Sequence, residues 1–250
     1  MSFYKQSILV IVAAGCFFDA RSQSSFSGWL IVNNQVTFNK KFSLLHTLTV
    51  RSTDKWLHRQ TLLLRPGIQY RINTHWSLAA GYSFVNSRQT IDDFNKYTIE
   101  HQLWQQAVFS HNLKIGKALH KKPGRLTHRV RLEERFMPTV YLQSNTIKTN
   151  GTVYATRLRY LLRDITPLRT SPLFEKGLYI ALQNELLVNI TGREYLSGQL
   201  FDQNRSYLAI GYRFSKKTDL EAGYMYRYIE SSDEGVLRDH VAQVMLFFRF

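Results

Sequence analysis

The sequence has one cysteine, few prolines and acidic residues, and no long apolar run beyond its first segment. A single cysteine, Cys16, allows no internal disulfide. Prolines number 5 against 30 phenylalanines and tyrosines, a bias that favours strands. No later stretch approaches the roughly 20 apolar residues of a membrane helix. With 44% hydrophobic residues and a net charge of +15, the chain is a basic folded protein rather than a disordered one.

Residues 1–22 are typical of a secretory signal peptide. A lysine precedes the apolar stretch from Ile8 to Phe18, which is too short to span a bilayer. Small residues at positions 20 and 22 predict cleavage before Gln23, which removes the cysteine and leaves residues 23–250 as a single domain. The alternative is that Cys16 becomes a lipidated N-terminal residue, although Ala13 stands where such motifs usually have leucine.

Apolar and polar residues alternate repeatedly along the rest of the chain, which indicates strands with two unlike faces. In residues 205–214, Leu208 and Ile210 share one face, and Ala209 and Arg213 share the other. The same period predicts eleven strands, at about residues 27–38, 42–52, 57–72, 75–87, 97–110, 125–137, 151–164, 177–190, 203–215, 218–231 and 238–250.

The connections between these strands alternate in length. Short ones are predicted at residues 39–41, 73–74 and 216–217, and longer polar ones at 86–96, 138–150, 191–204 and 231–238. Long strands with short turns at one end describe an all-β fold, an antiparallel transmembrane β-barrel with short periplasmic turns and longer outer loops. The expected location is the bacterial outer membrane.

The strand count leaves one question open. If both ends of the barrel are periplasmic, the number of strands must be even, and the pattern yields eleven. Either a strand near residues 111–124 or 165–176 is missing from the list, or the first segment crosses only partly. We therefore expect 10–12 strands.

Charged residues on the polar faces predict a charged barrel interior. Interlocked arginine–glutamate pairs would brace a narrow barrel, which is a structural role. Arginine outnumbers glutamate there by about three to one, so pairing cannot neutralise all of the charge, and a narrow anion-tolerant pore stays open beside the structural role. The predicted interior set is Arg51, Arg59, Arg65, Arg71, Glu100, Arg129, Arg131, Glu133, Arg135, Arg157, Arg159, Arg163, Glu185, Arg213, Glu221 and Arg227.

The sequence gives little indication of a catalytic site. Ser110 and His111 are adjacent, so in a strand their side chains point to opposite faces, and no serine lies in a Gly-x-Ser-x-Gly motif. We therefore predict no enzyme, cofactor or metal site, with an outer-membrane lipid-modifying hydrolase as the alternative. A second alternative is a soluble periplasmic lipid or lipopolysaccharide binder with its apolar face inward. The basic residues are spread over all strands, so we expect no nucleic-acid partner.

The chain ends on an apolar strand, "HVAQVMLFFRF". Leu246, Phe248 and Phe250 share a face with Ala242 and Val244. A last strand that ends in phenylalanine resembles the signal read by the barrel-assembly machinery, so Phe250 is the predicted assembly signal. The expected partners are that machinery and outer-membrane lipids, and the protein is expected to be a monomer.

Several stretches together resemble a known family. "LLLRPGIQYRIN", "WSLAAGYSF", "EHQLWQQ", "RVRLEERF", "RLRYLLR", "YIALQNELLVN" and "FDQNRSYLAIGYRFS" occur in the order of the domain of unknown function 2490, over roughly Trp29 to Phe250. The resemblance implies a small outer-membrane β-barrel of Gram-negative bacteria and implies no activity. Among the polar residues of these stretches, Asn204 and Arg205 are expected near the outer rim, and the others in the interior.

Overall fold

The computed structural model describes residues 23–113, 124–168, 174–231 and 235–250, so the predicted signal peptide lies outside it. Eleven strands account for most of the described residues, and their positions match the eleven predicted segments. They are β1 (Gln23–Thr37), β2 (Phe42–Ser52), β3 (Arg59–Arg71), β4 (Trp76–Ile91), β5 (Phe94–Leu113), β6 (Gly124–Gln143), β7 (Thr146–Pro167), β8 (Gly177–Thr191), β9 (Phe201–Ser215), β10 (Thr218–Ser231) and β11 (Gly235–Arg249).

Two single-turn 3-10 helices, η1 (Asp54–Trp56) and η2 (Arg193–Tyr195), lie in connections between strands. No helix in the described part of the chain is long and apolar enough to cross a membrane.

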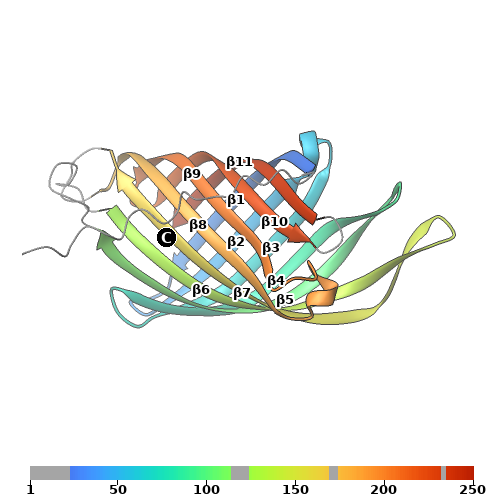
Figure 1. The fold of residues 1–250 in the computed structure, drawn as a ribbon. Helices are drawn as coiled ribbons and strands as arrows, with labels where there is room; N and C mark the ends of the chain where they lie inside the picture. The colour runs from blue at the N-terminus through green and yellow to red at the C-terminus, as the bar shows by residue number, and fades with distance from the viewer. Residues whose placement is uncertain (1–22, 114–123, 169–173, 232–234) are drawn as a thin grey trace, which may run out of the picture.

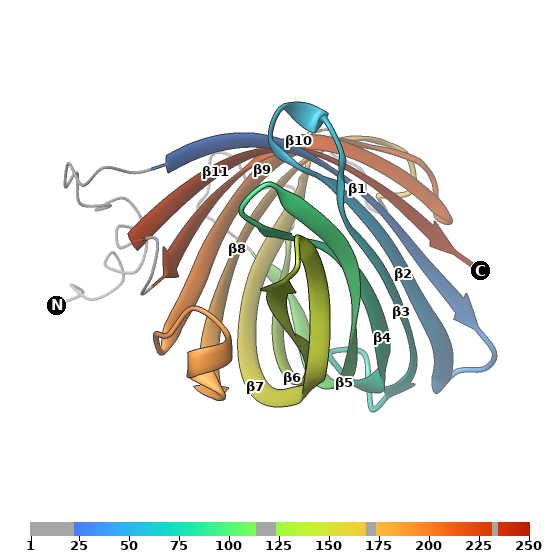
Figure 2. The same ribbon diagram turned by 90° about the vertical axis from the view of Figure 1, so that its right-hand side faces the viewer.

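The strands close into one barrel, in which each strand pairs with its neighbours in sequence (Figures 1 and 2). All of these sequential pairs are antiparallel. The barrel closes through a parallel pair, in which β1 residues 23–35 face β11 residues 237–249. We call this pair the seam. An odd number of strands can close only in this way, because the first and last strands then run in the same direction. Eleven strands lie within the expected 10–12, and the even number that two periplasmic ends would require is not found among the described strands. β1 crosses the full wall, which excludes a partial crossing, and the alternative of a missed strand near residues 111–124 or 165–176 falls partly on residues outside the described ranges.

The two ends of the barrel differ. At the turn end, β1 and β11 finish, and short connections join β1 to β2, β3 to β4 and β9 to β10. At the opposite, hairpin end, the β4–β5 and β6–β7 hairpins extend beyond the wall (Figure 1, right).

These two hairpins overturn the predicted loops at residues 86–96 and 138–150. β4 continues to Ile91 and β5 begins at Phe94, while β6 and β7 are separated by Ser144 and Asn145 alone. Both turn residues of the second hairpin have positive φ angles, 48° and 58°, as a two-residue hairpin turn requires. The polar composition of these segments suggested loops, but their backbones pair across the hairpin as far as the turn.

The wall of the barrel is apolar outside and polar inside. On β9, Leu208 and Ile210 are 54% and 64% exposed on the outer surface, whereas Arg205 of the same strand faces inward and is 5% exposed. Glu133 and Glu221 are also buried, at 0% and 1%. A water-soluble barrel has the opposite arrangement. Here many large apolar side chains form an outer belt, and a smaller apolar cluster around Trp29 and Tyr179 lies inside beside the charged residues.

Aromatic side chains gather on the outer surface near the turn end. Phe42 and Tyr70 lie with ring centroids 5.2 Å apart, and Trp76 and Phe109 lie 4.8 Å apart. The C-terminal residue belongs to this group, because the Phe250 ring stacks on Phe248 at 6.5 Å. The Phe250 backbone N–H donates to the Gln35 carbonyl at 2.8 Å, which ties the chain end to β1. Such a ring of aromatics is typical of a membrane–water interface.

Inside the wall, small residues make room for two large rings. Trp104 is 1% exposed and lies against Gly67 and Gly81, where a Cβ atom would come within 2.4 Å and 2.6 Å of the indole. Tyr179 lies against Gly211 in the same way, at 2.2 Å. These glycines are needed for close approach, because any side chain would displace the ring that fills the interior.

Candidate functional site

The barrel interior holds a network of ion pairs. Among the described residues, eleven arginines pair with seven acidic side chains within it. The arginines are Arg65, Arg129, Arg131, Arg135, Arg157, Arg159, Arg163, Arg205, Arg213, Arg227 and Arg249, and the acidic residues are Glu100, Glu133, Glu185, Asp202, Asp219, Glu221 and Asp239. β-strand alternation places these side chains on one face, and barrel closure brings them together.

Glu133 lies at the centre of this network. Its carboxylate is 2.7 Å from Arg159, 2.9 Å from Arg157, 3.1 Å from Arg65 and 3.7 Å from Arg131. These four arginines come from β3, β6 and β7. The carboxylate is fully buried, so four cations offset the cost of removing it from water, and it in turn reduces their mutual repulsion.

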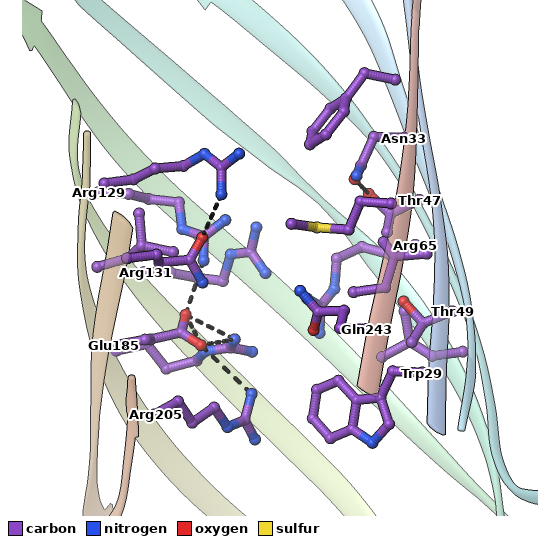
Figure 3. Close-up of a pocket in the computed structure, with 18 of the residues that line it drawn as sticks. Trp29, Asn33, Thr47, Thr49, Arg65, Arg129, Arg131, Glu185, Arg205 and Gln243 are labelled. Atoms are coloured by element: carbon purple, nitrogen blue, oxygen red, sulfur yellow. Dashed lines mark hydrogen bonds and ion pairs between the residues drawn. The ribbon is translucent and has the colours of Figure 1, made fainter. Parts of the chain in front are cut away.

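Glu185 forms a second centre next to the first. It accepts hydrogen bonds from Arg159 at 2.7 Å and from Arg129 at 2.8 Å, and Arg205 lies 3.4 Å away (Figure 3). Arg159 contacts both Glu133 and Glu185, so one guanidinium group joins the two centres. Its planar, multiply donating head suits such a bridge, which a lysine ammonium would not reproduce.

Smaller ion pairs continue the network toward both ends. Toward the hairpin end, Arg135 lies 2.5 Å from Glu100, and Arg227 lies 2.5 Å from Asp239.

Toward the turn end, Asp219 pairs with Arg213 at 2.9 Å and with Arg249 at 2.6 Å. Near them, Glu221 pairs with Arg163 and accepts a hydrogen bond from the Tyr179 hydroxyl at 2.9 Å. Charged pairs therefore line the interior along most of its length.

Two cavities lie inside the barrel. The larger, the turn-side cavity, has a volume of about 430 Å³ and extends from Trp29 near mid-wall to Gln35 and Phe247 close to the strand ends. The other, of about 420 Å³, lies toward the hairpin end and is lined by Glu100 and Arg135, among others.

Between the two cavities lie the residues that we call the waist layer: Arg65, Gln102, Glu133, Arg157 and Arg159. They are linked by direct contacts, since Arg65 donates to Gln102 at 3.2 Å and to Glu133 at 3.1 Å. Arg157 extends the layer to Asp202 at 3.2 Å. Glu133 and Arg157 line neither cavity. The waist layer therefore places long, hydrogen-bonded side chains of β3, β5, β6 and β7 between the two cavities.

Most of the predicted interior residues lie in this network, but Arg59 does not. The pairing register of β2 and β3 shifts by one residue between Arg51 and Ser52, a bulge that turns Arg59 to the outer surface. There it donates to Asn86 at 2.7 Å and lies 4.5 Å above the Tyr97 ring. This prediction was wrong.

Arg71 lies an even number of residues from Arg65 on β3, as predicted for the inner face, but it is exposed at the turn end of the strand. It takes no part in the ion pairs described above. Arg205 was expected near the outer rim and is instead 5% exposed, in contact with Glu185. Asn204 faces outward and bonds to Asn184.

Three interior aspartates escaped the sequence interpretation. Asp219 shares the inner face of β10 with Glu221, and Asp239 shares the inner face of β11 with Gln243. Extending the alternation to the strand ends would therefore have identified both. Asp202 has no such signal, because a bulge between β8 and β9 turns both Asp202 and Gln203 inward. With these three acids, more of the arginine charge is compensated than the ratio of arginine to glutamate indicated.

The candidate catalytic pair is separated, as the strand geometry predicted. The Ser110 hydroxyl is 3.0 Å from the Thr127 hydroxyl on the inner face. The His111 ring stacks on His128 with centroids 5.6 Å apart, and His128 bonds the hydroxyl of Tyr160, which is 41% exposed. Within the described ranges, no group of histidine, cysteine, aspartate or glutamate side chains could hold a metal ion.

Comparison with known proteins agrees with the sequence resemblance. The profile of a family described as "Protein of unknown function (DUF2490)" matches residues 26–237. An uncharacterized protein of Methylorubrum extorquens is 25% identical over 189 residues, which cover 76% of this chain and 72% of that protein. No solved structure matches the chain.

The central position of Glu133 leads to a prediction about stability. Glu133→Gln removes the charge that four arginines share, so the free energy of unfolding should fall by about 3–5 kcal/mol, as when one partner of a buried ion pair is lost. Denaturant unfolding of the detergent-purified barrel, followed by circular dichroism, measures this change.

The matched control is Glu134→Gln, the same change at the next residue. Its carboxylate points to the other face and accepts one long hydrogen bond, 3.4 Å, from Gln105. It should unfold like the wild type. Equal unfolding midpoints for the two variants would show that Glu133 does not hold the interior together.

Proposed function

The chain belongs to the DUF2490 family, and from that membership and its inverted polarity we propose that it is an outer-membrane β-barrel closed at its waist. In this proposal residues 1–22 are a cleaved export signal and residues 23–250 form the mature, monomeric barrel. The proposed role is non-catalytic: the barrel forms a rigid, charge-filled wall element that excludes solutes at the waist layer.

One observation carries the membrane proposal, the exposure of large apolar side chains on the outer surface beside buried charges. Ile68, Leu182 and Ile210 are 60%, 51% and 64% exposed, while Arg65 and Glu185 are 8% and 3% exposed. Such a surface would aggregate in water, but it matches hydrocarbon lipid. A soluble lipid binder with an inward apolar face would need the reverse arrangement.

The aromatic residues near the turn end support an orientation. In outer-membrane barrels the short turns face the periplasm. Connection length does not separate the two ends here, because residues 114–123 and 168–176 connect strands at the turn end, while the β4–β5 and β6–β7 turns at the hairpin end are tight. The hairpin end carries the extensions beyond the wall, as the longer extracellular segments of such barrels do, and the turn end carries the exposed Phe250, so we assign the turn end to the periplasmic side. The hairpin end would then project from the cell surface.

The waist layer supports a closed barrel rather than a wide pore. Barrels of about 8 strands are filled by side chains, and those of 16–18 strands hold a water channel. With eleven strands, this barrel lies between these classes, so the side chains inside it decide whether it is filled or holds a water channel. In this proposal the fully buried carboxylate and the four guanidinium groups around it narrow the interior at that level too far for a continuous water path.

Membrane placement can be tested by cell fractionation. The protein should co-sediment with outer membranes, and its folded form should migrate faster on a denaturing gel when unboiled than when boiled. A periplasmic protein of known solubility, processed in parallel, should stay in the soluble fraction. Recovery of this chain in the soluble fraction, with no heat-dependent shift, would refute the proposal.

Closure of the waist can be tested in planar lipid bilayers. The wild-type protein should give no long-lived conductance steps, whereas the double substitution Glu133→Ala and Arg157→Ala should shorten two side chains of the waist layer and give resolved steps. Glu134→Ala, on the outer face, is the matched control and should remain silent. Stable anion-selective steps from the wild type would instead identify a pore.

The proposed assembly signal can be tested by Phe250→Ala, which removes the ring and keeps the backbone hydrogen bonds of residue 250 with β1. The ring is 60% exposed, so the substitution should lower the amount of folded barrel in the outer membrane several-fold, with little effect on the stability of molecules that do assemble. Phe38→Ala, at an equally exposed phenylalanine (65%) of the turn end, is the control. Equal losses for both variants would mean that the aromatic belt, not the chain end, is recognised.

A further inference from the structure

Arg51 is an arginine of the barrel interior that forms no ion pair in the described parts of the chain. It lies on β2, and its guanidinium carbon is 3.9 Å from the centre of the Trp29 ring. Its Nε atom is buried and has no hydrogen-bond partner in the structure. Arg51 as a whole is half-buried and lines the turn-side cavity. Its cation is therefore partly removed from water without gaining a carboxylate, an arrangement that an anion in the cavity would stabilise.

Stacking on Trp29 leaves the donors of Arg51 free. A guanidinium group that lies flat on an indole directs its N–H groups outward in its own plane, where they can meet an oxyanion. Trp29 is 6% exposed and is therefore a fixed support. Arg205 and Arg227 lie over the same ring, at 5.4 Å and 5.1 Å, so three cations surround one neutral side chain.

The turn-side cavity beside Arg51 has a large excess of positive charge. Glu185 is the one acidic residue that lines it, and three arginines already share that carboxylate. The arginines of the lining are Arg51, Arg65, Arg129, Arg131, Arg159, Arg163 and Arg205. Behind the lining, Glu133 and Glu221 pair with others of these arginines, so three carboxylates face seven guanidinium groups. The protein itself therefore supplies too little negative charge at this place.

The remaining lining residues suit a small polar ligand. Asn33, Thr47 and Thr49 face the arginine cluster from the opposite wall, and Gln243 lies beside Trp29 (Figure 3). A volume of about 430 Å³ is in the range of small-ligand sites. Several converging guanidinium groups match a ligand with many acceptor oxygens and more than one negative charge, as in phosphate groups, better than a single carboxylate.

We infer that the turn-side cavity is a binding site for a soluble phosphate-type oxyanion, with Arg51 as the arginine that the ligand pairs. The barrel wall separates the cavity from lipid, so the ligand is a solute rather than a lipid headgroup. The inference rests on the proposed function, because it requires the turn end to open to an aqueous compartment.

Inorganic pyrophosphate is the probe, titrated calorimetrically into the detergent-purified barrel in phosphate-free buffer. The wild type should bind it, and Arg51→Gln should weaken binding by about tenfold or more, the scale of one charge-assisted hydrogen-bonded pair. Arg51→Lys keeps the charge but loses the planar fork, so an intermediate loss is expected. Arg59→Gln, an outward-facing arginine of the adjacent strand, is the matched control and should bind like the wild type.

Three results would overturn the inference: no binding by the wild type, equal binding by Arg51→Gln and the wild type, or binding of phosphatidic acid micelles without binding of pyrophosphate. If both Arg51 variants fail to fold, the unfolding midpoint of the wild type is measured with increasing pyrophosphate. Binding should raise this midpoint in a concentration-dependent way, and an unchanged midpoint refutes the site. The gel shift of the same samples separates the two proposals: a heat-modifiable barrel without binding rejects the site alone.

Discussion

The contact between one buried carboxylate and four guanidinium groups is the interaction on which the interior of this protein depends. An outward apolar belt leaves the polar faces of all strands inside, where arginines are abundant and water is scarce. Without Glu133, the arginines of β3, β6 and β7 would repel one another across a space that the barrel must fill. Because the Glu133 carboxylate offsets their charge, the long arginine side chains can pack together in the interior. Arg159 also pairs with Glu185, so it links the two carboxylates.

The interior combines two kinds of filling. Around Trp104 and Tyr179, glycines on neighbouring strands let large rings lie directly on the backbone, as in a conventional core. In the waist layer, hydrogen-bonded charged side chains fill the interior instead. Compensation is incomplete beyond the waist, and there the structure changes from packed ion pairs to a cavity in which Trp29 rather than an acid supports Arg51. The proposed closure of the waist and the proposed anion site thus both rest on one uneven charge distribution.

Much of this fold is predictable from sequence, because strand alternation is a local property that two-sided strands must have. All eleven strands and the sorting of their residues into two faces follow from it. Which face points inward, and with it the interior position of Glu133, came from the composition of the faces rather than from alternation itself. Bulges break the rule, since one extra residue reverses the faces that follow, which explains both the outward Arg59 and the inward Asp202. The stacking of Arg51 on Trp29 was beyond prediction too, because it depends on cross-strand register. The parallel closure was not predicted, because alternation gives eleven strands but does not show how the first and the last of them pair.

That closure has a kinetic meaning. Every other strand pair joins segments that are adjacent along the chain, whereas the seam joins residues more than two hundred positions apart, as in the contact of Ser25 with Asp239 at 2.9 Å. Contacts of such high contact order form last, because the entropy of closing the whole chain must first be overcome. A parallel ladder is also slightly weaker per residue than an antiparallel one. The line that completes the wall is therefore also the line along which a lateral gate would open first.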